Sequence, residues 1–417
     1  MATYPINQIR NQFPALNRTY NGLPAVYFDG PGGSQVVQES IDAIVTYMSN
    51  GGANLQGQFP TSRETENYIL EAREIVADLL GTRPEEVAFG QNATSLAFSI
   101  ARAVSNTWNR GDEIVLTEMD HPANIDSWLT VAKEKGVNVR WIKVDSKTCT
   151  LDLSNLNSII NEKTRLVAVT LASNAIGTIS NIESISPHVK KVNALLALDA
   201  VHAVPHFAID RKKLGADIIL CSAYKFFGPH VGIAVIRKEL FEGLNTYKVG
   251  PSPAKIPDKL ETGTQNFSGI SAIKPAIEFI EKLGTGSSRR ERIISGYERI
   301  EKHENQLAHL MRNGLTSIEG VKMFQSTNLI ASTPTIAFCI EGISPTDFCR
   351  KLAEEYAIFA ADGHFYATRL ADRLGVLDKG GWIRAGIAPY NTVEEVERFV
   401  SAVRQITFNA VMEPQNN

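Results

Sequence analysis

The chain has 417 residues, a formal net charge of -3 at pH 7 and a hydrophobic content of 43%. This length suits one large and one smaller domain, and a near-neutral charge with both signs interspersed points to neither nucleic acid nor an anionic membrane as a partner. Residues 1–10 have no apolar core behind a basic leader, and no segment reaches about 18 uninterrupted apolar residues. We therefore expect a cytoplasmic protein.

The cysteines are scattered along the chain, at Cys149, Cys221, Cys339 and Cys349. Their spacing matches neither a disulfide framework nor a zinc site. Free cysteine commonly serves as a small buried apolar residue. We expect no metal site and interpret these residues as buried or incidental.

Helical stretches alternate with short apolar runs from about residue 60 to residue 236. The candidate strands are residues 87–89, 113–117, 139–142, 166–171, 195–198, 217–221 and 232–236. Because helices separate most of these strands, they predict an α/β fold with a mainly parallel seven-stranded sheet covered on both faces. A ligand of such a sheet binds beyond the carboxyl ends of the strands, and we expect the site there.

Polar residues follow the first strands of this predicted sheet. Asn92, Ala93 and Thr94 open a helix whose free N–H groups suit a phosphate, although Asn and Thr are also ordinary helix caps. His121 follows the second strand, where an imidazole suits stacking on a flat ring, proton transfer or simple helix capping. Asn174 follows the fourth strand and offers an amide to a ring hydroxyl or a carboxylate, although its segment alone is typical of a turn.

Asp199 and Lys225 are the most informative pair, because each comes just after a short apolar strand. A carboxylate and an amine at the ends of neighbouring parallel strands match the needs of pyridoxal 5′-phosphate. The lysine binds the cofactor's aldehyde, and the aspartate keeps the pyridine nitrogen protonated so that the ring accepts electrons. Read alone, either residue is an ordinary cap or loop residue. Ser222, three residues before the lysine, offers a further hydroxyl to the phosphate.

Later in the chain, Thr264 lies in an irregular segment that suits either closure of a phosphate site, including that of a second subunit, or an ordinary surface loop. Arg384 lies among apolar and small residues, where a guanidinium needs an anion. A planar fork fits a substrate carboxylate, and an internal salt bridge is the alternative.

A Gly/Ser-rich stretch at residues 284–288 predicts a domain boundary, and a long polar helix follows at about residues 290–314. A strand at 335–340 and helices at about 345–355 and 392–406 predict a small α+β domain. The predicted division is an N-terminal segment (1–24) packed beside the small domain, a large domain (25–286) and the small domain (287–417).

With these motifs, the chain resembles the class V aminotransferase superfamily of fold-type I pyridoxal-phosphate enzymes, and within it the cysteine desulfurase and selenocysteine lyase branch. The likeness runs from residues 26–33 (Val-Tyr-Phe-Asp-Gly-Pro-Gly-Gly) to residues 384–392 (Arg-Ala-Gly-Ile-Ala-Pro-Tyr-Asn-Thr). It implies pyridoxal 5′-phosphate as cofactor, an amino acid as substrate and a homodimer with shared active sites.

The resemblance also implies a role for individual residues. Lys225 resembles the lysine that holds the cofactor, Asp199 the partner of the pyridine nitrogen and His121 the ring-stacking imidazole. Arg384 matches the arginine that binds the substrate carboxylate, and Thr264 the threonine that reaches the neighbouring subunit's site. The other positions that the likeness places at the cofactor are Asn92, Ala93, Thr94, Asn174, His202, Ser222 and Tyr224.

The chain departs from the desulfurase pattern at the loop 361–368, which reads Ala-Asp-Gly-His-Phe-Tyr-Ala-Thr. Tyr366 occupies the position of the sulfur-accepting cysteine, and Ala361 stands near the place of an arginine. His202 replaces a glutamine and resembles the kynureninase and epimerase branches, while Tyr224 replaces a histidine. Without a thiolate in this loop, persulfide formation by the usual route lacks its nucleophile.

Our leading hypothesis is therefore carbon–sulfur lyase or β-elimination chemistry on a cysteine-type amino acid, with Tyr366 or His364 as proton donor to the leaving group. The alternative is another outcome of the same early steps, namely transamination, racemisation or epimerisation, or carbon–carbon bond formation on a specialised amino acid. A third hypothesis, a non-catalytic protein that binds the cofactor structurally, conflicts with the joint retention of the four residues expected to do the chemistry.

Overall fold

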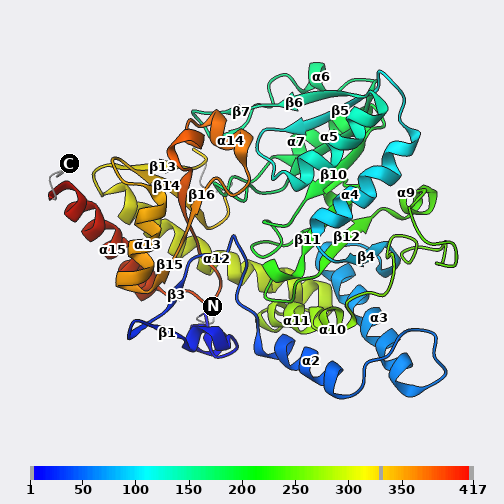
Figure 1. Cartoon of the computed structure of the whole chain (residues 1–417), viewed down its shortest axis with the longest axis horizontal. Helices are drawn as coiled ribbons and strands as arrows, with labels where there is room; N and C mark the ends of the chain where they lie inside the picture. Colours follow the sequence, from blue (N-terminus) through cyan, green and yellow to red (C-terminus); the bar gives the residue numbers. More distant parts are fainter. Residues whose placement is uncertain (1–3, 328–331, 413–417) are drawn as a thin grey trace.

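The computed structural model describes residues 4–327 and 332–412 (Figure 1). A seven-stranded sheet has the order β4-β12-β11-β10-β9-β5-β6, and β12 alone runs antiparallel to its neighbours. The predicted sheet is confirmed, with each strand within two residues of its expected bounds. The strands are β4 (Val87–Gly90), β5 (Glu113–Thr117), β6 (Asn138–Ile142), β9 (Thr164–Thr170), β10 (Leu195–Asp199), β11 (Ile218–Ser222) and β12 (Gly232–Ile236).

Successive strand residues face opposite sides of this sheet, so two apolar clusters form. On one side Ala88, Ile114 and Leu116 pack with the apolar faces of α4 and α5, and on the other Val87 and Val115 pack with α3, α7 and α11. Both faces are therefore covered, as the long apolar runs of the strands require. These helices are α3 (Pro60–Leu80), α4 (Ala93–Val104), α5 (Ala123–Lys135), α7 (Ile182–Lys191) and α11 (Ile273–Leu283).

A smaller antiparallel sheet has the order β13-β14-β17-β16. The expected strand at 335–340 is its β14, whereas the other three strands were missed by the sequence analysis. Helices α12, α13 and α15 pack on this sheet in a third apolar cluster. The elements are β13 (Val321–Phe324), β14 (Thr335–Ile340), β16 (Ala361–Gly363), β17 (Trp382–Gly386), α12 (Arg289–Thr316), α13 (Pro345–Tyr356) and α15 (Val393–Met412).

Helix α12 connects the two sheets, because its first half packs in the core of the large sheet and its second half in that of the small one (Figure 1). The N-terminal segment lies against the small sheet's side: Tyr4 stacks on His303, Arg10 pairs with Glu395 at 2.8 Å, and β3 (Val26–Tyr27) pairs with β15 (Ile358–Phe359). The domain limits themselves stay predictions, and residues 1–3 and 413–417 lie outside the described residues.

The remaining elements are short or peripheral. Within residues 4–327 and 332–412, no helix combines the length and apolarity needed to cross a membrane. The peripheral elements are α1 (Ile6–Arg10), α2 (Gln38–Ser49), α6 (Leu156–Ile159), α8 (Arg211–Leu214), α9 (Lys238–Gly243), α10 (Phe267–Ser271), α14 (Thr368–Arg373), β1 (Thr19–Tyr20), β2 (Leu23–Pro24), β7 (Val144–Asp145) and β8 (Thr150–Leu151).

Helices α11 and α12 cross so closely that Gly296 has no room for a side chain. A Cβ there would overlap the carbonyl oxygen of Ile280, which is backbone and cannot rotate away. We expect Gly296→Ala to lower the free energy of unfolding by about 1–3 kcal/mol, the range typical of overpacking. The measurement is the urea unfolding curve. Gly243→Ala is the control, because a Cβ at that helical position meets nothing within 4 Å; equal effects of the two changes would contradict the packing argument.

Candidate active site

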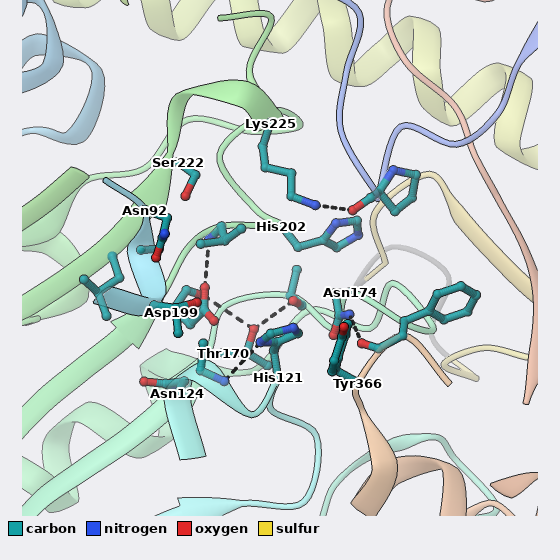
Figure 2. A pocket seen from close by; sticks show the side chains of 18 of the residues that line it. Asn92, His121, Asn124, Thr170, Asn174, Asp199, His202, Ser222, Lys225 and Tyr366 are labelled. Carbon is teal, nitrogen blue, oxygen red and sulfur yellow. Dashed lines mark hydrogen bonds between the residues drawn. The ribbon is translucent and has the colours of Figure 1, made fainter. Parts of the chain in front are cut away.

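The described residues enclose a cavity of about 320 Å³ beyond the carboxyl ends of the parallel strands (Figure 2). Two residues predicted to act at the site are absent from its lining: Thr264, which is exposed on an irregular segment, and His364, the alternative proton donor. Residues from both sheets therefore meet in one space. The predicted residues that line the cavity are Asn92, Ala93, Thr94, His121, Asn174, Asp199, His202, Ser222, Tyr224, Lys225 and Arg384.

Lys225 lies in the turn after β11 and is buried. Its Nζ donates a hydrogen bond to the carbonyl oxygen of Pro31, and no carboxylate in the described part of the chain forms an ion pair with it. Burial, and then the charge of Arg384, lower the pKa of Lys225 to about 7. A substantial fraction of this amine is therefore neutral and nucleophilic near neutral pH.

Asp199 ends β10 and is also buried. Its Oδ1 accepts a hydrogen bond of 2.9 Å from the backbone N–H of Val201, and burial raises its pKa to about 6. A second buried acid, Asp120, accepts hydrogen bonds from the hydroxyl of Thr117 and from Nδ2 of Asn124 (2.6 Å). Burial raises the pKa of Asp120 to about 7, and the charge of Asp199 adds to this increase.

Arg384 lies in the middle of β17 and is 4% exposed. Its Nη1 donates to the backbone oxygen of Asn174 at 2.6 Å, its Cζ lies 3.6 Å from the ring centre of Phe365, and its Nε has no partner among the described residues. Burial lowers its pKa to about 9, so it stays charged at neutral pH. No ion pair to a carboxylate satisfies this cation within the described ranges. The internal salt bridge considered above is thus not observed.

His121 lines the cavity and also caps a helix, so capping is observed, whereas ring stacking and proton transfer stay predictions. Its Nδ1 accepts a hydrogen bond of 3.1 Å from the N–H of Ala123, the first residue of α5. Burial, and then the charge of Lys225, lower its pKa to about 4, so the ring is neutral at neutral pH. The ring of Tyr366 lies 5.7 Å from it (Figure 2).

The residues at the N-terminus of α4 fit a phosphate group. Asn92 is the N-cap, and its side chain accepts from the N–H of Ser95 at 2.8 Å. Ala93 and Thr94 follow in the first turn, where backbone N–H groups lack helical partners. With the hydroxyl of Ser222 on the same lining, this end of the cavity offers donors and a favourable dipole to an anion.

His202 reaches the small sheet from the cavity wall. Its Nε2 lies 2.9 Å from the hydroxyl of Thr335 and 3.3 Å from that of Thr333, and its Nδ1 has no partner within the described residues. Burial lowers its pKa well below the usual range, so it is a neutral polar group. It therefore connects the cavity to β14 without adding charge.

The sequence analysis missed several lining residues. Pro31 contributes a carbonyl oxygen, which no side-chain pattern signals. Asn124 lies in the first turn of α5, after β5, and Thr170 is the last residue of β9. Their positions at or after the end of an apolar strand were the available signal. Phe365 contacts a cation far away in sequence, and only the folded arrangement reveals that contact.

The comparisons with known proteins agree with this geometry. The sequence model of the aminotransferase class-V family matches residues 26–399, and the chain belongs to this family. It is 30% identical to an aminotransferase-like protein, FGM3, of Gibberella zeae over 97% of this chain and 99% of the relative, and 29% identical to a probable cysteine desulfurase of Pyrococcus abyssi over 91% and 94%. It superposes on the apo cysteine desulfurase of Thermococcus onnurineus NA1 with a TM-score of 0.89 at 27% identity, covering 98% and 100% of the two chains.

The protein is thus a pyridoxal-phosphate-dependent enzyme of the cysteine desulfurase-like, fold-type I architecture. The residues present fit this cofactor on structural grounds: a buried lysine without a carboxylate partner, a buried carboxylate and a helix N-terminus line one cavity. The individual roles of the predicted residues stay predictions.

The lowered pKa of Lys225 gives a direct test in the cofactor-free protein. We expect its acetylation by trace acetic anhydride to rise through about pH 7, because only the neutral amine reacts. Arg384→Gln should move the curve to higher pH and Asp199→Asn to lower pH, since the first removes a repelling charge and the second an attracting one. Mass spectrometry of the peptides measures the reaction, with exposed Lys255 in the same sample as internal reference. A curve that rises only near the ordinary lysine value of about 10.4 would contradict the burial effect.

Proposed function

We propose that the enzyme is a carbon–sulfur lyase that performs β-elimination on a cysteine-type amino acid and releases sulfide or a persulfide directly. One observation supports this proposal above the others: Tyr366 lies at the cavity beside His121, and no cysteine of the described chain lines the cavity. Burial raises the pKa of both Cys221 and Cys349, so neither is a ready thiolate. Sulfur therefore has no protein thiolate to receive it at the site.

Pyridoxal phosphate, when bound, links to the substrate amine and spreads the negative charge that develops at the α-carbon. In our proposal Arg384 orients the substrate through its carboxylate. The Nζ of Lys225 takes the α-proton, and Asp199 holds a proton at the ring nitrogen. The carbon–sulfur bond breaks with its electron pair on sulfur, and the hydroxyl of Tyr366 or the imidazole of His364 supplies the proton that sulfur takes up.

The alternative reactions begin with the same residues. Transamination, racemisation or carbon–carbon bond formation needs Lys225, Asp199 and Arg384 equally and differs only in the steps after removal of the α-proton. The aminotransferase-like name of one relative at 30% identity favours keeping transamination as the second candidate. A purely structural role for the cofactor is disfavoured by the joint retention of Lys225, Asp199, His121 and Arg384 around one cavity, since a site without catalytic function need not keep them together.

The lyase proposal predicts that cofactor-loaded protein converts cysteine or cystine to pyruvate with release of sulfide or persulfide, and that Lys225→Ala abolishes this. Cys339→Ser, which changes the one cysteine that is not fully buried, should keep full activity. Tyr366→Phe or His364→Gln, whichever removes the proton donor, should lower kcat by about 100-fold or more. Product assays and intact-protein mass measure these outcomes. A persulfide on Cys339, or conversion of the cofactor to its amine form without pyruvate, would overturn the lyase assignment.

We also propose that the functional unit is a cytoplasmic homodimer in which Thr264 of one subunit completes the phosphate site of the other. The support is that Thr264 is exposed and lies outside the cavity of its own chain, while the other residues predicted to bind the cofactor line that cavity.

Shared sites predict complementation between two defective variants. Lys225→Ala lacks the reacting amine and Thr264→Val lacks the hydroxyl offered to the neighbouring site, so each alone should be impaired. After unfolding and refolding of an equal mixture, about a quarter of the sites should be fully wild type, because half of the dimers are mixed and each has one intact site. Activity and native mass spectrometry provide the measurement. Mixed dimers without recovered activity would exclude the shared site.

A further inference from the structure

Phe365 contacts Arg384, the cation at the cavity, and also Asn174, to which Arg384 is hydrogen-bonded. Its ring lies 3.6 Å from the Cζ of Arg384, and its backbone oxygen accepts a hydrogen bond of 3.0 Å from Nδ2 of Asn174. Arg384 in turn donates to the backbone oxygen of Asn174 at 2.6 Å, so each of the three residues contacts the other two. The three residues come from different parts of the fold: the loop after β16, the turn after β9 and the middle of β17.

The loop adopts a costly backbone conformation at this point. Phe365 and Tyr366 have φ values of 51° and 62°, so two consecutive bulky residues lie in the left-handed region. The N–H of Tyr366 donates to Nδ1 of His364 at 3.1 Å, and the N–H of Thr368 donates to the oxygen of Tyr366 at 2.7 Å. Such strain persists only where surrounding contacts hold it, and the contacts of Phe365 with Arg384 and Asn174 are tertiary contacts that can do so.

An aromatic ring is an unusual partner for a buried guanidinium because it does not neutralise the charge. A carboxylate would occupy the in-plane N–H groups and neutralise the cation. A ring stacked on the face attracts the cation through its quadrupole, and it leaves the edge of the guanidinium free to donate. Consistent with this, Nε of Arg384 has no partner in the described residues.

We propose that Phe365 determines specificity for substrates with a free carboxylate, by covering one face of Arg384 and holding its edge toward the cavity. This inference rests on the proposed role of Arg384 as the carboxylate site. A carboxylate then binds only in the guanidinium plane. Because Tyr366 is the next residue, the same contact holds the backbone that carries the ring 5.7 Å from His121. Carboxylate recognition and placement of Tyr366 are thus coupled through one side chain.

The test is binding to the cofactor-loaded enzyme of two small probes that differ at the carboxylate. Calorimetry gives the affinity for 3-mercaptopropionate, which has a carboxylate and no amine, and the visible spectrum gives that for cysteamine, which has an amine and no carboxylate. We expect Phe365→Leu to weaken binding of 3-mercaptopropionate by about 5- to 30-fold, as loss of a desolvated cation–π contact implies, and to leave cysteamine binding within about twofold. Phe365→Trp should restore the affinity.

Two further variants separate the possible failures. Phe359→Leu is the matched control, because this ring packs on Tyr20 and Tyr27 and does not contact Arg384; it should change neither affinity. If Arg384→Gln abolishes binding of 3-mercaptopropionate and Phe365→Leu has no effect, the role of Phe365 is wrong and the carboxylate site stands. If Arg384→Gln also has no effect, the carboxylate site itself is wrong. If the enzyme forms no pyruvate from cysteine but binds the two probes as expected, the proposed lyase reaction is wrong and the role of Phe365 stands.

Discussion

The structure depends on buried charges that are not paired with one another. Lys225 and Arg384 are cations and Asp199 and Asp120 are acids, all in or beside one small cavity, yet neither cation forms an ion pair with a carboxylate of the described chain. Removing a charge from water costs several kcal/mol unless partners compensate. The chain offsets this cost only in part, through carbonyl oxygens, a hydroxyl, an amide, an aromatic ring and the more distant charges of Asp199 and Asp29. The unmet requirement is for ligand groups of complementary charge, and this is what makes the cavity a binding site.

The fold explains how such charges stay in place. Lys225 and Asp199 come from neighbouring parallel strands of the large sheet, whereas Arg384 comes from the middle of the small one. The relation between the two sheets therefore sets the distance between Lys225 and Arg384. Helix α12, which packs in both cores, and His202, which bonds to Thr335 of β14, are among the contacts that hold this relation. A change in either would alter the site without touching a residue of the reaction.

The sequence was sufficient for the large sheet and for most of the lining. Strands β10 and β11 are apolar runs that end at or just before a polar residue, so both the strand and the position of Asp199 or Lys225 follow from one pattern. The small sheet was harder, because β16 has three residues and its pairing with β17 is not local. Phe365 was missed for a related reason: a cation–π contact across 19 residues leaves no periodic signal. Thr264 was predicted from its irregular segment and from the resemblance, and it lies outside the cavity of its own chain, so its predicted role stays a prediction.

The replacement of a cysteine by Tyr366 changes what the loop after β16 has to do. A nucleophilic thiolate must travel between the substrate and a second acceptor, which favours a loop free to move. A phenol that donates a proton carries no sulfur to an acceptor, and its hydroxyl is effective only at a fixed position relative to the reacting atoms. The strained backbone at Phe365 and Tyr366, held by Arg384 and Asn174, is consistent with the second requirement. If Tyr366 donates that proton and Arg384 binds a carboxylate, as we propose, the contact of Phe365 with Arg384 connects the proton-donating loop to the carboxylate site.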